Sequence, residues 1–168
     1  MHVAVGLLQK GCKKTNKQKV PTMTTFTETI KIAAPIADVW DILADIGSIA
    51  EWNPGLVGSN ATNEITGLGA TRFCDIDGRQ NLDEEVVHFE PQRAITFRIT
   101  RSTLPFRQAD IRFTLTPEGQ TTLVEASPEY LLKYGVIGKL LDKAVVSKMY
   151  RKGMKGLLSG LKERAESN

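Results

Sequence analysis

The chain has 168 residues, 41% of them hydrophobic, which fits a single globular domain with its own core. Its two cysteines and two histidines exclude a disulfide framework and a metal site built from several histidines. The absence of a disulfide framework makes a reducing compartment the default, so we expect a cytoplasmic protein, and no apolar run approaches the roughly 18 residues of a membrane span. The net charge of +3 reflects five lysines within residues 1–22; the remainder is nearly neutral, and nucleic-acid binding is not expected.

Residues 1–22 show no useful periodicity, and we expect a basic, disordered leader there. Their short apolar run precedes the lysines, whereas a secretory signal carries its basic residues first. A basic arm that binds a surface is the functional alternative. Translation from an upstream start is another explanation, because Met23 opens the first patterned segment. The folded, ligand-binding domain is expected to span residues 23–166.

Residues 24–32 alternate between apolar and polar side chains and are rich in β-branched residues, which is typical of a strand. Pro35 then begins a helix, in which Trp40 lies at helical spacing from its apolar neighbours and is expected in the core. A second short helix is expected at 48–51, with Ser48 as its cap, before a turn at 52–55.

Six further strands follow, each bounded by turn residues, and their short intervals are typical of an antiparallel meander. Alternation places Ile95, Phe97 and Ile99 on the inner face of one strand, and Ile111 and Phe113 on the inner face of the next. The predicted strands cover 56–62, 70–76, 80–89, 94–101, 106–116 and 121–132.

The longest run with helical period covers 135–163, and its apolar face changes direction between 145 and 147. We therefore expect a short lead-in helix, a break and a long helix. Each interior glycine costs about 1 kcal/mol against alanine, so a glycine-lined edge indicates a close approach by the sheet or by a ligand. The apolar side expected to face protein is Met149, Tyr150, Met154, Leu157 and Leu161, edged by Gly153, Gly156 and Gly160.

These elements predict an α+β fold: a seven-stranded curved antiparallel sheet packed on a long C-terminal helix, with two short helices after the first strand. Five segments, in this order, are similar to the motifs of one known family: IAAPIADVW at 32–40, EWNP at 51–54, GLGATR at 67–72, EEV at 84–86 with FEP at 89–91, and LTPEGQTTLV at 115–124.

The chain from residue 25 to about 166 thus resembles the START-like (SRPBCC) superfamily, on its polyketide cyclase/dehydrase and lipid-transport side. The resemblance implies a helix-grip fold with an elongated cavity between the sheet and the C-terminal helix. It also implies a hydrophobic small molecule in that cavity. No cofactor and no metal ligands are expected.

The expected cavity lining combines aromatic residues, the inner side of the long helix and one acid. For the aromatic residues, plain core packing is the alternative. The candidates are Trp52, Phe73, Glu84, Phe97, Tyr130, Tyr134, Met149, Gly153, Gly156 and Leu157. The loops at 67–69 and 102–106 are candidate gates of the cavity.

Glu84 is the candidate acid or base. In a strand it shares a face with Leu82, Val86 and His88, so Glu84 and His88 could project into the cavity together. A carboxylate in an apolar pocket has a raised pKa and can transfer protons. The alternatives are a structural partner of an arginine or an exposed acid in an acidic run, and a bulge would change which face is inside.

Arginines on three strands, Arg72, Arg98 and Arg112, could anchor a ligand carboxylate or lie on the outer face of the sheet. Three functions therefore fit the sequence. The first is binding or carriage of a hydrophobic small molecule such as a lipid, a quinone or a polyketide-like compound. The second is a polyketide aromatase/cyclase or dehydratase that uses Glu84. The third is an interaction module that docks an acidic partner or an anionic membrane through Lys148, Arg151, Lys152 and Lys155.

Overall fold

The computed structural model describes residues 23–133 and 145–167 of the chain. The leader expected at 1–22 and the lead-in helix expected before residue 145 lie outside the described residues. The elements are, in order, β1 (Thr24–Thr25), β2 (Glu28–Ile32), α1 (Ile36–Ala44), the 3₁₀ helix η1 (Ile46–Glu51), β3 (Gly58–Ala61), β4 (Thr71–Asp75), β5 (Asn81–Glu90), β6 (Ala94–Ser102), β7 (Phe106–Glu118), β8 (Thr121–Leu132) and α3 (Ser147–Glu166).

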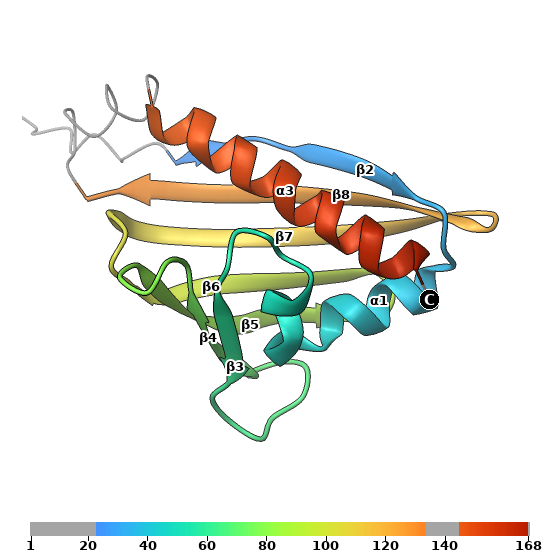
Figure 1. Cartoon of the computed structure of the whole chain (residues 1–168), viewed down its shortest axis with the longest axis horizontal. Helices are drawn as coiled ribbons and strands as arrows, with labels where there is room; N and C mark the ends of the chain where they lie inside the picture. Colours follow the sequence, from blue (N-terminus) through green and yellow to red (C-terminus); the bar gives the residue numbers. More distant parts are fainter. Residues whose placement is uncertain (1–22, 134–144, 168) are drawn as a thin grey trace, which may run out of the picture.

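The strands form one sheet in which every pair of neighbours is antiparallel, and it runs from β1 through β8, β7, β6, β5 and β4 to β3. β2 also pairs with β8, so the first and last strands of the chain lie side by side. Figure 1 shows α3 lying diagonally across one face of this sheet, with α1 beneath its C-terminal end. The α+β architecture predicted from the sequence is confirmed.

One correction concerns the first strand, which was predicted as continuous over 24–32 and is divided into β1 and β2. The interruption lies opposite Pro128 of β8, between the pairs Thr25–Glu129 and Glu28–Ala126. Proline has no backbone N–H and cannot complete a strand ladder, so the regular pairing is lost at this point. The sheet consequently has eight strands instead of seven.

The core follows from the alternation of side chains along the long strands. In β7 the buried residues Ile111, Phe113 and Leu115 alternate with exposed or half-buried ones, which confirms the predicted inner face. Trp40 of α1 is 6% exposed and packs on Phe89 with 5.2 Å between ring centroids, which confirms its predicted place in the core. No helix among the described residues is long and apolar enough to cross a membrane.

α3 is attached to the sheet most firmly along its C-terminal half, where all of its buried residues lie, from Met154 to Ala165. The Lys162 ammonium donates a hydrogen bond to the Lys31 carbonyl oxygen at 2.9 Å, and the Ala33 N–H donates to Glu166 Oε1 at 2.6 Å. No residue between 147 and 153 is buried. The C-terminal half of the helix is therefore fastened to β2 and to the segment between β2 and α1.

Candidate ligand-binding site

A cavity of about 420 Å³ lies between the sheet and α3. The sheet contributes lining residues from β4 to β7, the segment after η1 contributes a side wall, and α3 covers the other side. The wall is mainly aliphatic and aromatic, and it includes Leu56, Leu82, Ile99, Phe113, Met154 and Leu157. Such a space favours an apolar molecule, because burial of apolar surface drives its binding.

The polar part of the wall is a buried ion pair between Arg72 of β4 and Glu84 of β5, each 4% exposed. The strand register places the two residues directly opposite each other, so their side chains meet on the inner face. Arg72 Nε and Nη2 contact Glu84 Oε2 at 2.7 and 2.6 Å, and Arg72 Nη1 donates to the Ile46 carbonyl oxygen at 3.4 Å. The guanidinium also lies 4.0 Å from the ring centroid of Phe97, in a cation–π contact.

Cys74 follows Arg72 on the inner face of β4, and its thiol lies 3.8 Å from Glu84 Oε2. Burial raises the pKa of the Cys74 thiol to about 12, and the carboxylate of Glu84 adds to this effect, while the Arg72 charge opposes it. The thiol is therefore protonated at neutral pH and is a poor nucleophile.

Tyr150 of α3 lines the cavity from the helix side, and its ring packs on Phe26, Phe106 and Tyr130 with centroid distances of 5.6, 5.6 and 5.2 Å. Its hydroxyl oxygen is shielded from solvent and has no hydrogen-bond partner among the described residues. Burial raises the pKa of the Tyr150 phenol, and the negative charge of Glu84 raises it further. The phenol is therefore neutral at any physiological pH and can donate a hydrogen bond.

Of the residues predicted to line the cavity, the structure brings together Glu84, Met149, Gly153 and Leu157. Met149 is 68% exposed and lies at the rim, so the prediction that it faces protein is wrong. Trp52 and Gly156 border a separate hollow of about 370 Å³ between η1 and α3. Outside the cavity lining lie Phe73, Phe97 and Tyr130, and Tyr134 falls outside the described residues.

Two of these differences have simple geometric causes. Arg72 and Cys74 are the inward residues of β4, so Phe73 between them points to the opposite face. Tyr130 is completely buried beneath Tyr150 and belongs to the aromatic cluster, while Phe97 is covered by the guanidinium of Arg72.

The predicted pairing of Glu84 with His88 is wrong, because β5 contains a bulge. Val86 pairs with Phe97 of β6, but the next pair is His88 with Thr96, which leaves Val87 as an extra residue. The extra residue turns His88 to the outer face, where its Nε2 lies 2.9 Å from Glu90 Oε1. Glu84 is therefore inside the cavity without a histidine beside it.

The three glycines of α3 have different surroundings, although they share one edge of the helix. A Cβ atom added to Gly160 would lie 1.7 Å from the Trp52 carbonyl oxygen, so this glycine allows the backbone after η1 to approach the helix. A Cβ on Gly156 would meet Pro54 at 3.8 Å, and a Cβ on Gly153 would meet nothing within 4 Å. The close approach predicted for this edge is thus a protein contact at Gly160.

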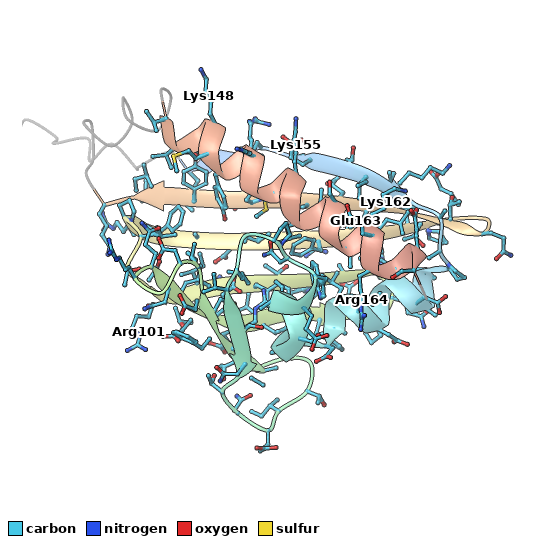
Figure 2. The ribbon with its side chains drawn as sticks, in the orientation of Figure 1. Arg101, Lys148, Lys155, Lys162, Glu163 and Arg164 are labelled. Carbon is cyan, nitrogen blue, oxygen red and sulfur yellow. The ribbon has the colours of Figure 1, made fainter. Side chains whose placement is uncertain are left out.

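The basic side of α3 is partly neutralised by the sheet. Arg151 Nη1 and Lys155 Nζ lie 3.0 and 3.8 Å from the two carboxylate oxygens of Glu28 on β2. Lys148 and Lys152 form no ion pair with any described residue. In Figure 2, Lys148 and Lys155 project from the same edge of α3, the upper one in this view.

Sequence reasoning missed several lining residues and did not identify which arginine pairs with Glu84, although a structural arginine partner was one of its alternatives and is confirmed. Arg72 was considered as a ligand anchor or an outer-face residue, whereas it is an internal partner of the acid, and Arg98 pairs instead with Asp110 at 2.8 Å. The signal for Cys74 was its place two residues after Arg72 on one strand. Leu104, Pro105 and Phe106 also line the cavity, from the predicted gate at 102–106. The described residues hold no group of three or more His, Cys, Asp or Glu that could bind a metal ion.

Comparison with solved structures shows the same fold at low sequence identity. A START superfamily protein from Mycobacterium smegmatis has 18% identity over 85% of this chain and 97% of its own, with a TM-score of 0.70. The Zhui aromatase/cyclase from Streptomyces sp. R1128 has 15% identity over 86% of this chain and 94% of its own, with a TM-score of 0.71. A norcoclaurine synthase from Thalictrum flavum has 12% identity over 88% of this chain and 97% of its own, with a TM-score of 0.69.

The helix-grip, START-like fold predicted from the sequence is thereby confirmed. No curated protein sequence matches the chain. The family model described as "Polyketide cyclase / dehydrase and lipid transport" matches residues 23–166. Because this match covers most of the chain, the protein belongs to the polyketide cyclase / dehydrase and lipid transport family.

Proposed function

We propose that the protein binds and carries a hydrophobic small molecule, such as a lipid, a quinone or a polyketide-like compound. The observation that carries this proposal is the largely apolar cavity of about 420 Å³ between the sheet and α3. Its volume lies in the range of roughly 300–1,000 Å³ that is usual for small-molecule sites. The lipid-transport family and the common fold with START and aromatase/cyclase proteins support the same function.

Native mass spectrometry of the freshly purified protein tests this proposal. A stoichiometric apolar adduct is expected, and extraction into organic solvent followed by mass analysis would identify it. An unmodified mass that persists after incubation with fatty acids, quinones and polyphenols would contradict the proposal.

A cavity-filling variant shows where the molecule binds. Ile99 shares the inner face of β6 with Ile95 and Phe97 but is only partly buried, because it borders the cavity. Ile99→Trp should therefore occupy the ligand space and abolish the adduct while the protein remains folded. Thr100→Trp is the matched control on the exposed outer face of the same strand and should retain the adduct.

A second candidate function is a polyketide aromatase/cyclase or dehydratase reaction with Glu84 as acid or base. Its support is the place of Glu84 in the cavity wall and the shared fold with two aromatase/cyclases. Under this alternative a bound linear poly-β-ketone is cyclised or dehydrated, and Glu84→Gln binds it without conversion. Recovery of the bound compound unchanged from the wild-type protein would exclude this function for that substrate class.

The third candidate is a weak contact with an acidic partner or an anionic membrane through the outer side of α3. Lys148 and Lys152 support it, since they flank the exposed Met149 and have no ion pair within the described part of the chain. Vesicles of phosphatidylserine should then bind the protein at low salt and release it near 0.5 M salt, and Lys148→Glu should abolish binding. Binding that is indifferent to salt would contradict an electrostatic contact.

A further inference from the structure

Only one oxygen of the Glu84 carboxylate, Oε2, has polar contacts within the described residues. Arg72 Nη2, Arg72 Nε and the Cys74 thiol contact Oε2 at 2.6, 2.7 and 3.8 Å, respectively. No hydrogen bond from a described residue to Oε1 is present. The residue is 4% exposed and lines the cavity. A carboxylate oxygen in the wall of an apolar cavity that has no protein donor would be stabilised by a bound molecule that supplies one.

A second polar group of the same cavity lacks a partner on the helix side. The hydroxyl oxygen of Tyr150 is shielded from solvent and has no hydrogen-bond partner within the described residues. Its phenol is neutral, because burial raises its pKa and the Glu84 charge adds to that rise. The cavity therefore contains one unused acceptor, on β5, and one unused donor, on α3.

We infer that the ligand is a neutral amphiphile whose hydroxyl group donates a hydrogen bond to Glu84 and accepts one from Tyr150. This inference rests on the proposed binding function and names the polar end of its ligand. Both residues line the cavity, and a hydroxyl group is both donor and acceptor, so an alcohol or a phenol lying between them could satisfy both groups.

The same geometry disfavours a ligand with a carboxylate. Three nitrogens of Arg72 are already engaged, two by Glu84 and one by the Ile46 carbonyl group. A ligand carboxylate would thus meet the Glu84 charge without gaining a free guanidinium. Alcohols and phenols should be preferred over fatty acids of similar size.

Three probes of nearly equal size separate these cases by isothermal titration calorimetry at pH 7: 2-naphthol, 2-methoxynaphthalene and 2-naphthoate. Because two hydrogen bonds distinguish the first two probes, 2-naphthol should bind at least about tenfold more tightly than the methyl ether. 2-Naphthoate should bind most weakly of the three. Equal affinity for 2-naphthol and its ether, or tight binding of 2-naphthoate, would overturn the inference.

Two tyrosine variants locate the effect. Tyr150→Phe should weaken 2-naphthol binding about three- to tenfold and leave the affinity for the ether unchanged. Tyr130→Phe is the matched control, because Tyr130 is a buried neighbour of Tyr150 that does not line the cavity, and it should leave both affinities unchanged. An equal loss for both probes in Tyr150→Phe would overturn the role of its hydroxyl group. A protein that binds none of the three probes would instead contradict the proposed binding function itself.

Discussion

Gly160 offers the sharpest test of how α3 is seated. A methyl group at this position would lie 1.7 Å from the Trp52 carbonyl oxygen, 2.9 Å from its carbonyl carbon and 3.1 Å from Pro54 Cδ. Two of these atoms belong to the backbone, which cannot rotate away as a side chain can. Gly160→Ala must therefore displace either the helix or the segment that follows η1.

The size of the effect follows from two opposing contributions. Replacing glycine by alanine inside a helix stabilises the protein by about 1 kcal/mol, because alanine loses less backbone entropy on folding. Inserting a methyl group into a packed contact typically costs about 1–3 kcal/mol, and backbone displacement places this case at or beyond the upper end. We expect a net loss of roughly 2 kcal/mol in the free energy of unfolding, or a Tm lower by about 4–8 °C.

Gly153→Ala is the matched control in the same helix, since its added methyl group would meet nothing within 4 Å. It should raise the free energy of unfolding by about 0.5–1 kcal/mol. Urea denaturation of both variants, followed by circular dichroism, measures the difference between them. Equal midpoints for the two variants would refute the conclusion that Trp52 and Gly160 are in backbone contact.

Three further predictions concern the cavity wall. Arg72→Met should lower the free energy of unfolding by about 3–5 kcal/mol, because it leaves the Glu84 charge buried and unpaired. The double variant Arg72→Met/Glu84→Met should recover much of this loss, and equal thermal stability of the single and double variants would contradict the reasoning. Tyr150→Phe loses no hydrogen bond in the ligand-free protein, so urea midpoints should be unchanged or higher, and a loss above about 1 kcal/mol would argue for a hidden partner. In a Cys12→Ser background, the Cys74 thiol, with its pKa near 12, should resist iodoacetamide at pH 9 unless the protein is unfolded, and rapid labelling of the native protein would contradict the prediction. The free energy of unfolding should also fall between pH 9 and 12, because the thiol ionises at a lower pH in the unfolded chain than in the folded protein.

Much of the fold could be predicted because local patterns determine it. Alternation along β6 and β7 identified the inner residues Phe97 and Phe113, and the turns between strands placed most boundaries within two residues. The exception was the break between β1 and β2. It depends on Pro128, which is about a hundred residues away in the sequence, and only the strand register brings it opposite the break.

The site was less predictable for the same reason. Strand period allowed Glu84 to face the cavity but left an exposed acid as an alternative, and its pairing with Arg72 is set by the register between β4 and β5. The wrong placement of His88 comes from one extra residue, Val87, and no residue type in the segment marks this bulge. The glycine edge of α3 indicated a close approach by the sheet or a ligand, whereas the structure has one only at Gly160, and the contacting atom, the Trp52 carbonyl oxygen, lies on the segment after η1, whose position the sequence does not specify.

The one-sided attachment of α3 has a consequence for motion. The half of the helix from Met154 onward is held by the core and by the contacts of Lys162 and Glu166, while the half that covers the cavity rim contributes no buried residue. The rim half is held by fewer contacts, chiefly the ring packing of Tyr150 and the ion pair between Arg151 and Glu28, so amide hydrogens near Met149 should exchange with solvent before those near Leu161. Under the proposed carrier function, a helix held mainly at its C-terminal half would let the cavity mouth widen for ligands of different bulk with little change in global stability.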